Sequence, residues 1–140
     1  MTFEQNVSWN EIELLVESLC KKILKLNRNF TSITTLSRGG LVPSRLVADY
    51  LGIESILIDK KKISSDSLFI DDIFDSGNAF HKVFSKVDSP SKFVFATLFA
   101  RRGKNYPKNL IYAKKTNDAG YVVFPWDKLE FKRNKNNLHI

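Results

Sequence analysis

The chain is poor in residues that bind metal through sulfur or imidazole, with one cysteine, Cys20, and two histidines, His81 and His139, among 140 residues. A single cysteine cannot form an internal disulfide, and a structural zinc site needs more such ligands than the chain has. No apolar run approaches the length of a membrane helix, and the N-terminal residues lack a basic segment followed by an apolar one. We therefore expect neither membrane insertion nor secretion, and a cytoplasmic location.

Acidic residues are the scarcer charged group, with 15 Asp and Glu against 22 Lys and Arg, which gives a formal net charge of +7. Such an excess suits nucleic acid, an anionic membrane surface or a small polyanionic substrate, and charge alone does not choose among them. The basic clusters are residues 60–62, residues 101–102 and Lys132, Arg133 and Lys135. No aromatic residues interleave with these clusters in the pattern of an RNA-binding surface, so we expect no nucleic-acid partner.

The order of the apolar segments predicts an α/β fold with an open, mostly parallel sheet and flanking helices. Ser8 has the spacing of a capping box before one amphipathic helix. Pro43 suits the first turn of a second helix, which carries Leu46, Val47, Tyr50 and Leu51 inward and is ended by Gly52. A third helix carries Phe80, Val83, Phe84 and Val87. The predicted strands are residues 33–36, 56–58, 68–70 and 93–99, and residues 110–113 and 121–124 add strands or a small lobe.

The domain organisation that we predict is a single domain over residues 1–130 followed by a polar C-terminal tail, residues 131–140. We expect this tail to be disordered or used in assembly.

The stretch from Leu68 to Ala79 is an apolar strand that ends in two carboxylates, Asp71 and Asp72, and turns into a helix. Ligands of open α/β sheets bind at this end of the strands. The loop 75–79 would direct backbone N–H groups, a helix N-terminus and the Ser76 hydroxyl at an anion such as phosphate. Two carboxylates beside a phosphate favour sugar hydroxyls or Mg²⁺ as partners. The competing interpretation is a charged strand end followed by a helix cap.

A second candidate anion site comes about thirty residues earlier, in Ser37-Arg38-Gly39-Gly40. The two glycines let backbone amides approach an oxyanion, and Arg38 adds a fixed positive charge. Alone, such a segment is usually just a turn. Because each of the two segments follows a strand, the pair is a much stronger indication of a ligand site than either segment by itself.

The two segments together resemble the signature of type I phosphoribosyltransferases. The resemblance implies that Asp71, Asp72, Asp75, Ser76, Gly77, Asn78 and Ala79 bind the 5-phosphate and ribose of phosphoribosyl pyrophosphate, and that Ser37, Arg38, Gly39 and Gly40 bind its pyrophosphate. It also implies Mg²⁺ as cofactor, with Asp72 as a candidate ligand. Asp127 follows Pro125-Trp126 and is a candidate ligand of a second metal, with a plain surface carboxylate as the alternative. Asp75 is the candidate for handling the purine proton, and Asp71 and Asp72 complete the catalytic set.

Further matches at residues 97–101 and 121–127 make the chain similar to bacterial xanthine-guanine phosphoribosyltransferases and their hypoxanthine-using relatives. This similarity implies that Tyr121 stacks on the purine, that the backbone of Val122 reads the base edge and that Arg101 faces the exocyclic oxygen. The implied fold is that of the type I enzymes, with a small C-terminal lobe that binds the base. The implied assembly is a homo-oligomer, either a dimer or a tetramer.

The function that the resemblance implies is transfer of the phosphoribosyl group to xanthine, guanine or hypoxanthine, with release of pyrophosphate, as in purine salvage. The alternative is a regulatory protein that binds phosphoribosyl pyrophosphate or a nucleotide without efficient catalysis.

Three departures from the family pattern bear on this choice. Arg101 stands where Lys is usual, Ala79 stands where Thr is common, and only Asp59 to Ser67 joins two strands that a long mobile lid loop usually connects. The short loop favours the regulatory alternative, whereas Asp71, Asp72 and Asp75 favour the enzyme.

Overall fold

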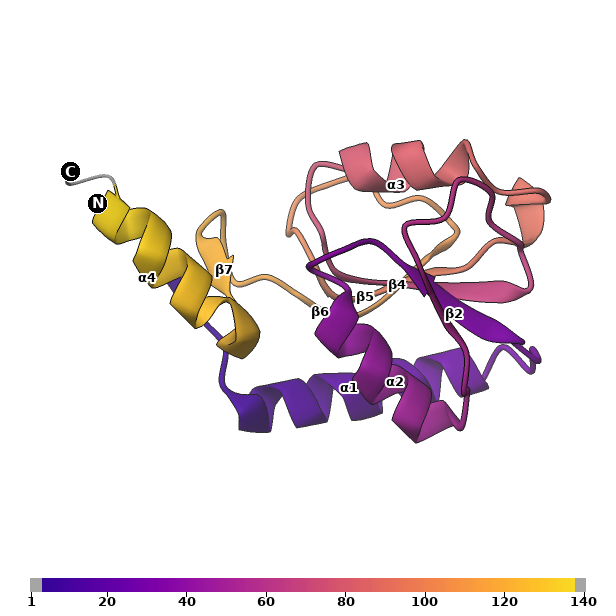
Figure 1. The fold of residues 1–140 in the computed structure, drawn as a ribbon, viewed down its shortest axis with the longest axis horizontal. Coiled ribbons are helices and arrows are strands. Elements are labelled where there is room, and N and C mark those ends of the chain that lie inside the picture. Colours follow the sequence, from indigo (N-terminus) through magenta and orange to yellow (C-terminus); the bar gives the residue numbers. More distant parts are fainter. Residues whose placement is uncertain (1–3, 138–140) are drawn as a thin grey trace.

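A parallel sheet of five strands organises the computed structural model, which describes residues 4–137 (Figure 1). The strand order is β3-β2-β4-β5-β6, with β4 at the centre. The strands are β2 (Ser32–Thr35), β3 (Ile56–Ile58), β4 (Ser67–Phe74), β5 (Phe95–Ala100) and β6 (Leu110–Lys115). All four neighbouring pairs are parallel, so the carboxyl ends of the strands meet at one edge of the sheet. The predicted fold class is confirmed.

Helices cover both faces of this sheet, as the near-continuous apolar strands predict. The helices α1 (Trp9–Leu24) and α2 (Leu41–Leu51) lie on one face, and α3 (Asn78–Phe84) and the 3-10 turn η1 (Pro90–Lys92) follow β4 on the other side (Figure 1). Side chains alternate along β4, so that Leu68 and Ile70 enter the core beneath α1 and α2 while Phe69 enters the aromatic core beneath α3. Phe69 stacks there on Phe95, with ring centroids 4.8 Å apart.

The helix ends follow the local sequence signals. Ser8 Oγ accepts a hydrogen bond from the backbone N–H of Glu11 at 3.1 Å, as the capping-box spacing predicts. Gly52 ends α2 with φ of 72°, a conformation that glycine adopts without a Cβ penalty. The prediction that Tyr50 faces inward is wrong, because its side chain lies on the solvent side of α2 and is 46% exposed.

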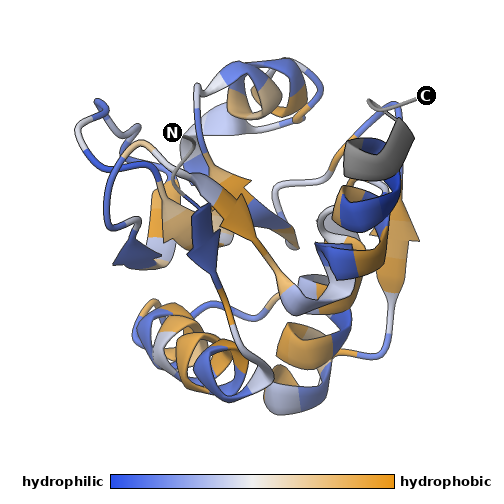
Figure 2. Cartoon of the chain, turned by 90° about the vertical axis from the view of Figure 1, so that its left-hand side faces the viewer, coloured by the Kyte–Doolittle hydropathy of each residue, from blue (hydrophilic) through white to orange (hydrophobic). Residues whose placement is uncertain are grey.

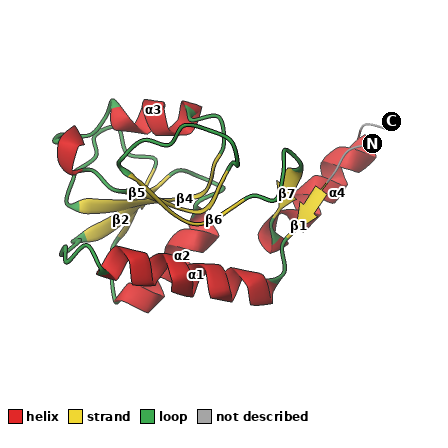
Figure 3. Cartoon of the chain, turned by 180° about the vertical axis from the view of Figure 1, so that it is seen from behind, coloured by secondary structure: helices red, strands yellow, loops and turns green. Residues whose placement is uncertain are grey.

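Both ends of the chain build a small second lobe beside the sheet (Figure 3). Strand β1 (Glu4–Asn6) pairs in parallel with β7 (Tyr121–Val123), with Gln5 opposite Val122. The 3-10 turn η2 (Pro125–Asp127) then leads into helix α4 (Lys128–Asn137). The lobe is therefore not only C-terminal, since its second strand comes from a polar N-terminal segment that carries no strand signal.

The predicted tail is largely helical, because α4 crosses position 131 and continues to Asn137. Disorder is therefore not observed for residues 131–137, and residues 138–140 lie outside the described part of the chain. Polar residues dominate α4, which is coloured mainly as hydrophilic in Figure 2. Within residues 4–137 no helix has both the length and the apolar content needed to cross a membrane.

We expect Ser8→Ala to lower the free energy of unfolding by about 1 kcal/mol, because the Glu11 N–H loses its partner at the start of α1. Urea denaturation followed by circular dichroism measures this loss. Ser89→Ala is the matched control, since Ser89 precedes η1 without a side-chain cap bond. Equal stabilities of the two variants would contradict the assigned cap.

Candidate functional site

The two predicted anion-binding segments both leave the carboxyl edge of the sheet. Strands β2 and β4 are neighbours, with Thr35 opposite Ile70, so the segments that follow them leave the same edge. The first segment reaches the acidic pair directly, because a Cβ atom placed on Gly39 would lie 2.9 Å from Asp72 Oδ2. The structure thus brings Gly39 of the predicted pyrophosphate loop against a carboxylate of the predicted ribose site.

Gly40 is required by close backbone packing. The Thr35 hydroxyl donates to the carbonyl oxygen of Ile70 at 2.6 Å, across the β2–β4 pair. A Cβ atom on Gly40 would overlap this hydroxyl and lie 2.8 Å from the Ile70 carbonyl oxygen. The loop can follow its path only without a side chain at this position. The peptide bond between Ser37 and Arg38 in the same loop is cis.

Ser37 has a partner within the protein. Its backbone N–H and its hydroxyl both donate to the carboxylate of Asp59, at 2.9 and 2.5 Å, and these hydrogen bonds lower the pKa of Asp59. Asp59 directly follows β3, which pairs with β2, so the segments that follow two neighbouring strands meet. Sequence reasoning missed this role of Asp59, although the adjacency of the two strands could have indicated it.

Asp71 and Asp72 are both partly buried near the end of β4. The Asp72 N–H donates to Asp71 Oδ1 at 2.8 Å, and the Ile73 N–H donates to Asp72 Oδ1 at 2.8 Å. Burial, followed by the negative charge of Asp71, raises the pKa of Asp72 to about 8, and burial also raises the pKa of Asp71. Two desolvated carboxylates this close repel each other, so a cation or a hydroxyl donor at this point would be favourable.

These two carboxylates fit a divalent cation that takes most of its other ligands from substrate. Mg²⁺ is usually held by one or two carboxylates together with phosphate oxygens and water. Within residues 4–137, no group of three or more His, Cys, Asp and Glu side chains is arranged to hold a metal ion.

The second anion-binding segment forms the start of α3. Gly77 precedes the helix with φ of 91°, and the Asn78 N–H lies 3.3 Å from the Ser76 hydroxyl oxygen. A small cavity of about 60 Å³ is formed here. Its lining residues are Ile73, Phe74, Asp75, Ser76, Gly77, Ala79, Phe80 and Phe95. The predicted phosphate-binding residues other than Asn78 and the acidic pair therefore surround one cavity.

Asp75 and Arg101, which the sequence predicts as separate parts of the site, form an ion pair. They directly follow the neighbouring strands β4 and β5, and Arg101 Nε lies 2.9 Å from Asp75 Oδ1. Arg101 Nη1 donates to the carbonyl oxygens of Asp118 and Gly120 at 3.0 and 2.8 Å. The Arg101 side chain is only 11% exposed. Its guanidinium therefore fixes Asp75 and the turn before Tyr121, and a base contact by Arg101 stays a prediction.

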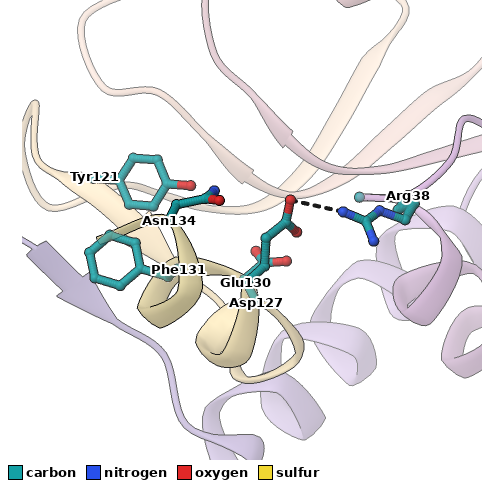
Figure 4. A pocket seen from close by; sticks show the side chains of 7 residues that line it. Arg38, Tyr121, Asp127, Glu130, Phe131 and Asn134 are labelled. Atoms are coloured by element: carbon teal, nitrogen blue, oxygen red, sulfur yellow. Dashed lines mark hydrogen bonds and ion pairs between the residues drawn. The ribbon is translucent and has the colours of Figure 1, made fainter. Parts of the chain in front are cut away.

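A pocket of about 260 Å³ connects the first anion-binding segment with the small lobe (Figure 4). Its lining residues are Arg38, Gly39, Tyr121, Asp127, Glu130, Phe131 and Asn134. Arg38 Nη2 lies 2.8 Å from Glu130 Oε1, and the rings of Tyr121 and Phe131 stack with centroids 5.7 Å apart. The pocket therefore joins the predicted pyrophosphate and purine positions in one space.

Asp127 lies in this pocket, as a candidate metal ligand should, but its role as a ligand stays a prediction. Burial raises the pKa of Asp127 to about 6, and the negative charges of Asp72 and Glu130 add to the increase. The Val122 side chain is buried in the hydrophobic core that also contains Ile12, and its backbone pairs with Gln5, so only its backbone is suited to contact a base.

Sequence reasoning missed the contribution of α4, namely Glu130, Phe131 and Asn134. These positions follow Asp127 at intervals of three and four residues, which places all of them on one face of a helix. That spacing could have indicated a helix, but the polar composition of residues 131–140 led to the prediction of a disordered tail or an assembly segment.

Comparison with known proteins supports the resemblance to type I phosphoribosyltransferases. No family model matches the chain. The xanthine-guanine phosphoribosyltransferase of Chromohalobacter salexigens is 27% identical in an alignment that covers 86% of this chain and 82% of that protein.

Solved structures share the fold at lower identity. The xanthine-guanine-hypoxanthine phosphoribosyltransferase of Helicobacter pylori superposes with a TM-score of 0.72 and 17% identity, over 96% of this chain and 99% of that one. A protein of Neisseria gonorrhoeae with bound ppGpp gives a TM-score of 0.71 and 15% identity, over 97% and 96% of the two chains. The fold is that of the type I phosphoribosyltransferases.

We expect Gly40→Ala to destabilise the protein by roughly 1–3 kcal/mol, because its Cβ meets a buried hydroxyl and a backbone carbonyl. Gly39→Ala should cost less, because its Cβ meets only the Asp72 carboxylate, which can turn away. Urea denaturation of both variants measures the two losses. The assigned loop path is wrong if Gly39→Ala is the more damaging change.

We expect metal-free protein to lose stability as the pH rises from 6 to 8.5. The pKa of Asp72 is about 8 in the folded state against an ordinary value of 3.8, so the folded state binds the proton more tightly over this interval. The unfolding equilibrium should shift by up to about tenfold per pH unit. Urea denaturation in EDTA, for the wild type and Asp72→Asn, measures this shift. A dependence on pH that is the same in both proteins would contradict the assignment.

Proposed function

We propose that this chain, which resembles the xanthine-guanine phosphoribosyltransferases, is a purine phosphoribosyltransferase. The reaction is transfer of the phosphoribosyl group from phosphoribosyl pyrophosphate to a 6-oxopurine such as xanthine, guanine or hypoxanthine, with release of pyrophosphate. The observation that carries the proposal is the contact between Gly39 and Asp72, which sets one anion-binding segment against the acidic pair that precedes the other. A phosphorylated pentose needs this arrangement, because its two phosphorylated ends must be held at once.

Binding would divide the substrate among three parts of the site. The 5-phosphate would occupy the segment 75–79, where Gly77 and the first turn of α3 present backbone N–H groups. The pyrophosphate would meet Arg38 and the amides of Gly39 and Gly40, and the ribose hydroxyls would meet Asp71 and Asp72. Fixing the reactants in line, rather than a covalent nucleophile, would then supply most of the rate enhancement.

Charge separates during the reaction, because the bond from ribose C1 to pyrophosphate breaks as the purine nitrogen approaches. Arg38 would stabilise the leaving pyrophosphate, and the carboxylates of Asp71, Asp72 and Asp75 would stabilise positive charge on the ribose. Mg²⁺, when bound by Asp72 and the substrate, would neutralise part of the pyrophosphate charge.

Asp75 would accept the proton that the purine nitrogen loses. Its carboxylate is held by the ion pair with Arg101, so Arg101 acts as a positioning residue for the proposed base. Arginine serves this purpose better than lysine, because its planar guanidinium can contact Asp75 and two carbonyl oxygens at the same time.

The purine would lie against the small lobe. Tyr121 is 56% exposed and offers an aromatic face next to the pocket that contains Arg38. A flat heterocycle gains from stacking on such a face. The backbone of Val122 is the candidate for reading the base edge.

A second candidate function is binding of phosphoribosyl pyrophosphate or a nucleotide for regulation. Two observations favour it. The connection 59–66 is short and is tied to the pyrophosphate segment through Asp59 and Ser37, so it is poorly suited to act as a mobile lid. The Neisseria gonorrhoeae protein shows that this fold can hold ppGpp.

Turnover separates the two candidates. The protein is mixed with phosphoribosyl pyrophosphate, Mg²⁺ and one base at a time, and released pyrophosphate is measured. We expect release with xanthine, guanine or hypoxanthine and none with adenine, which lacks the 6-oxo group. Binding of phosphoribosyl pyrophosphate without release for any base would favour the regulatory function.

We expect Asp75→Asn to lower kcat on the order of 100-fold or more, because an amide cannot accept the purine proton. Steady-state kinetics with the preferred base measures the change. Asp49→Asn is the matched control, since Asp49 also pairs with an arginine, Arg45, but on the exposed side of α2. Full turnover by Asp75→Asn would remove Asp75 from its proposed role.

A further inference from the structure

The C-terminal helix occupies groups that the proposed reaction needs. Glu130 lies 92 residues beyond Arg38 in sequence, yet its carboxylate contacts the Arg38 guanidinium at 2.8 Å (Figure 4). The next residue, Phe131, stacks on Tyr121 with an interplanar angle of 24°. Two consecutive residues of α4 therefore contact the proposed pyrophosphate ligand and the proposed purine platform.

We propose that Glu130 is a built-in competitor for the pyrophosphate group, which rests on the proposed function. Its carboxylate holds the Arg38 guanidinium in the free protein and gives it up when pyrophosphate or phosphoribosyl pyrophosphate binds. A carboxylate and a phosphate accept hydrogen bonds from the same N–H groups of a guanidinium, so Arg38 cannot bind both fully at the same time.

The contact is suited to exchange. The side chains of Arg38 and Glu130 are 69% and 45% exposed, and exposed ion pairs contribute little stability and are screened by salt. Glu130 is tethered to the same chain, so its local concentration near Arg38 stays high without a bound ligand. Both features suit an ion pair that a bound pyrophosphate can replace.

The exchange has a consequence for the reaction. Because Glu130 competes for Arg38, the site binds both phosphoribosyl pyrophosphate and pyrophosphate more weakly than it would without Glu130. The KM for phosphoribosyl pyrophosphate is therefore higher, and pyrophosphate is released faster. In the free protein, α4 contacts both Arg38 and the Tyr121 ring, where the base is proposed to stack.

Calorimetric titration of Glu130→Gln with inorganic pyrophosphate tests the proposal. We expect the variant to bind pyrophosphate about three- to fivefold more tightly than wild type at low salt. The gain should shrink as the ionic strength rises, because salt already weakens the ion pair in wild type. The KM for phosphoribosyl pyrophosphate should fall by a similar factor.

Two controls make the result specific. Glu17→Gln removes an equally exposed carboxylate from an ion pair with Lys21 on α1 and should leave pyrophosphate binding unchanged. In an Arg38→Gln background, the change at Glu130 should bring almost no gain, because the competition acts through Arg38. A gain that persists in that background would indicate a general charge effect and overturn the proposal.

The outcomes also separate this inference from the proposed function. Equal or weaker binding by Glu130→Gln, with measurable binding by wild type, would overturn the competition and leave the phosphoribosyltransferase proposal intact. Absence of pyrophosphate binding in every variant would overturn the pyrophosphate segment itself, and the competition with it.

Discussion

The parallel pairing of β2 with β4 is the constraint on which the site depends. With Thr35 opposite Ile70, the chain leaves both strands at the same edge of the sheet, and the Thr35 hydroxyl joins them through the Ile70 carbonyl oxygen. The segment after β2 then passes so close to β4 that Gly39 faces the Asp72 carboxylate. An anion-binding segment and an acidic pair are therefore held together by backbone pairing, which side chains alone could not fix as firmly.

Charge in the site is balanced by pairs that differ in exposure. The Arg101 side chain is largely buried and fixes Asp75 through charge-assisted hydrogen bonds, which favours a permanent positioning role. Arg38 and Glu130 are exposed, which favours exchange with a charged ligand. Among the described residues, no cationic side chain forms an ion pair with Asp71 or Asp72. Burial raises the pKa of both, and the negative charge of Asp71 raises that of Asp72 further. One site thus combines a fixed pair, an exchangeable pair and an acidic pair suited to a cation.

The sequence predicted the sheet and its flanking helices, because apolar strands are local signals. Glycine turns and acidic strand ends are local signals too, and they singled out the two candidate ligand segments. Sequence reasoning also selected Asp75 and Arg101, but not their contact, since the strand order that makes β4 and β5 neighbours is not a local property. The strand β1 was missed because its polar residues carry no strand pattern, and it forms only by pairing with the distant strand β7. The pairing of Glu130 with Arg38 was missed because it too joins residues that are far apart in the sequence, 92 positions in this case.

The most direct measurement is a crystal structure of the protein soaked with phosphoribosyl pyrophosphate and Mg²⁺. The account predicts the 5-phosphate at Ser76 to Ala79, the pyrophosphate at Arg38 to Gly40, and the ribose between them beside Asp71 and Asp72, with Glu130 turned away from Arg38. Density for the phosphate groups at only one of the two segments, or elsewhere on the molecule, would contradict a single site that spans β2 and β4.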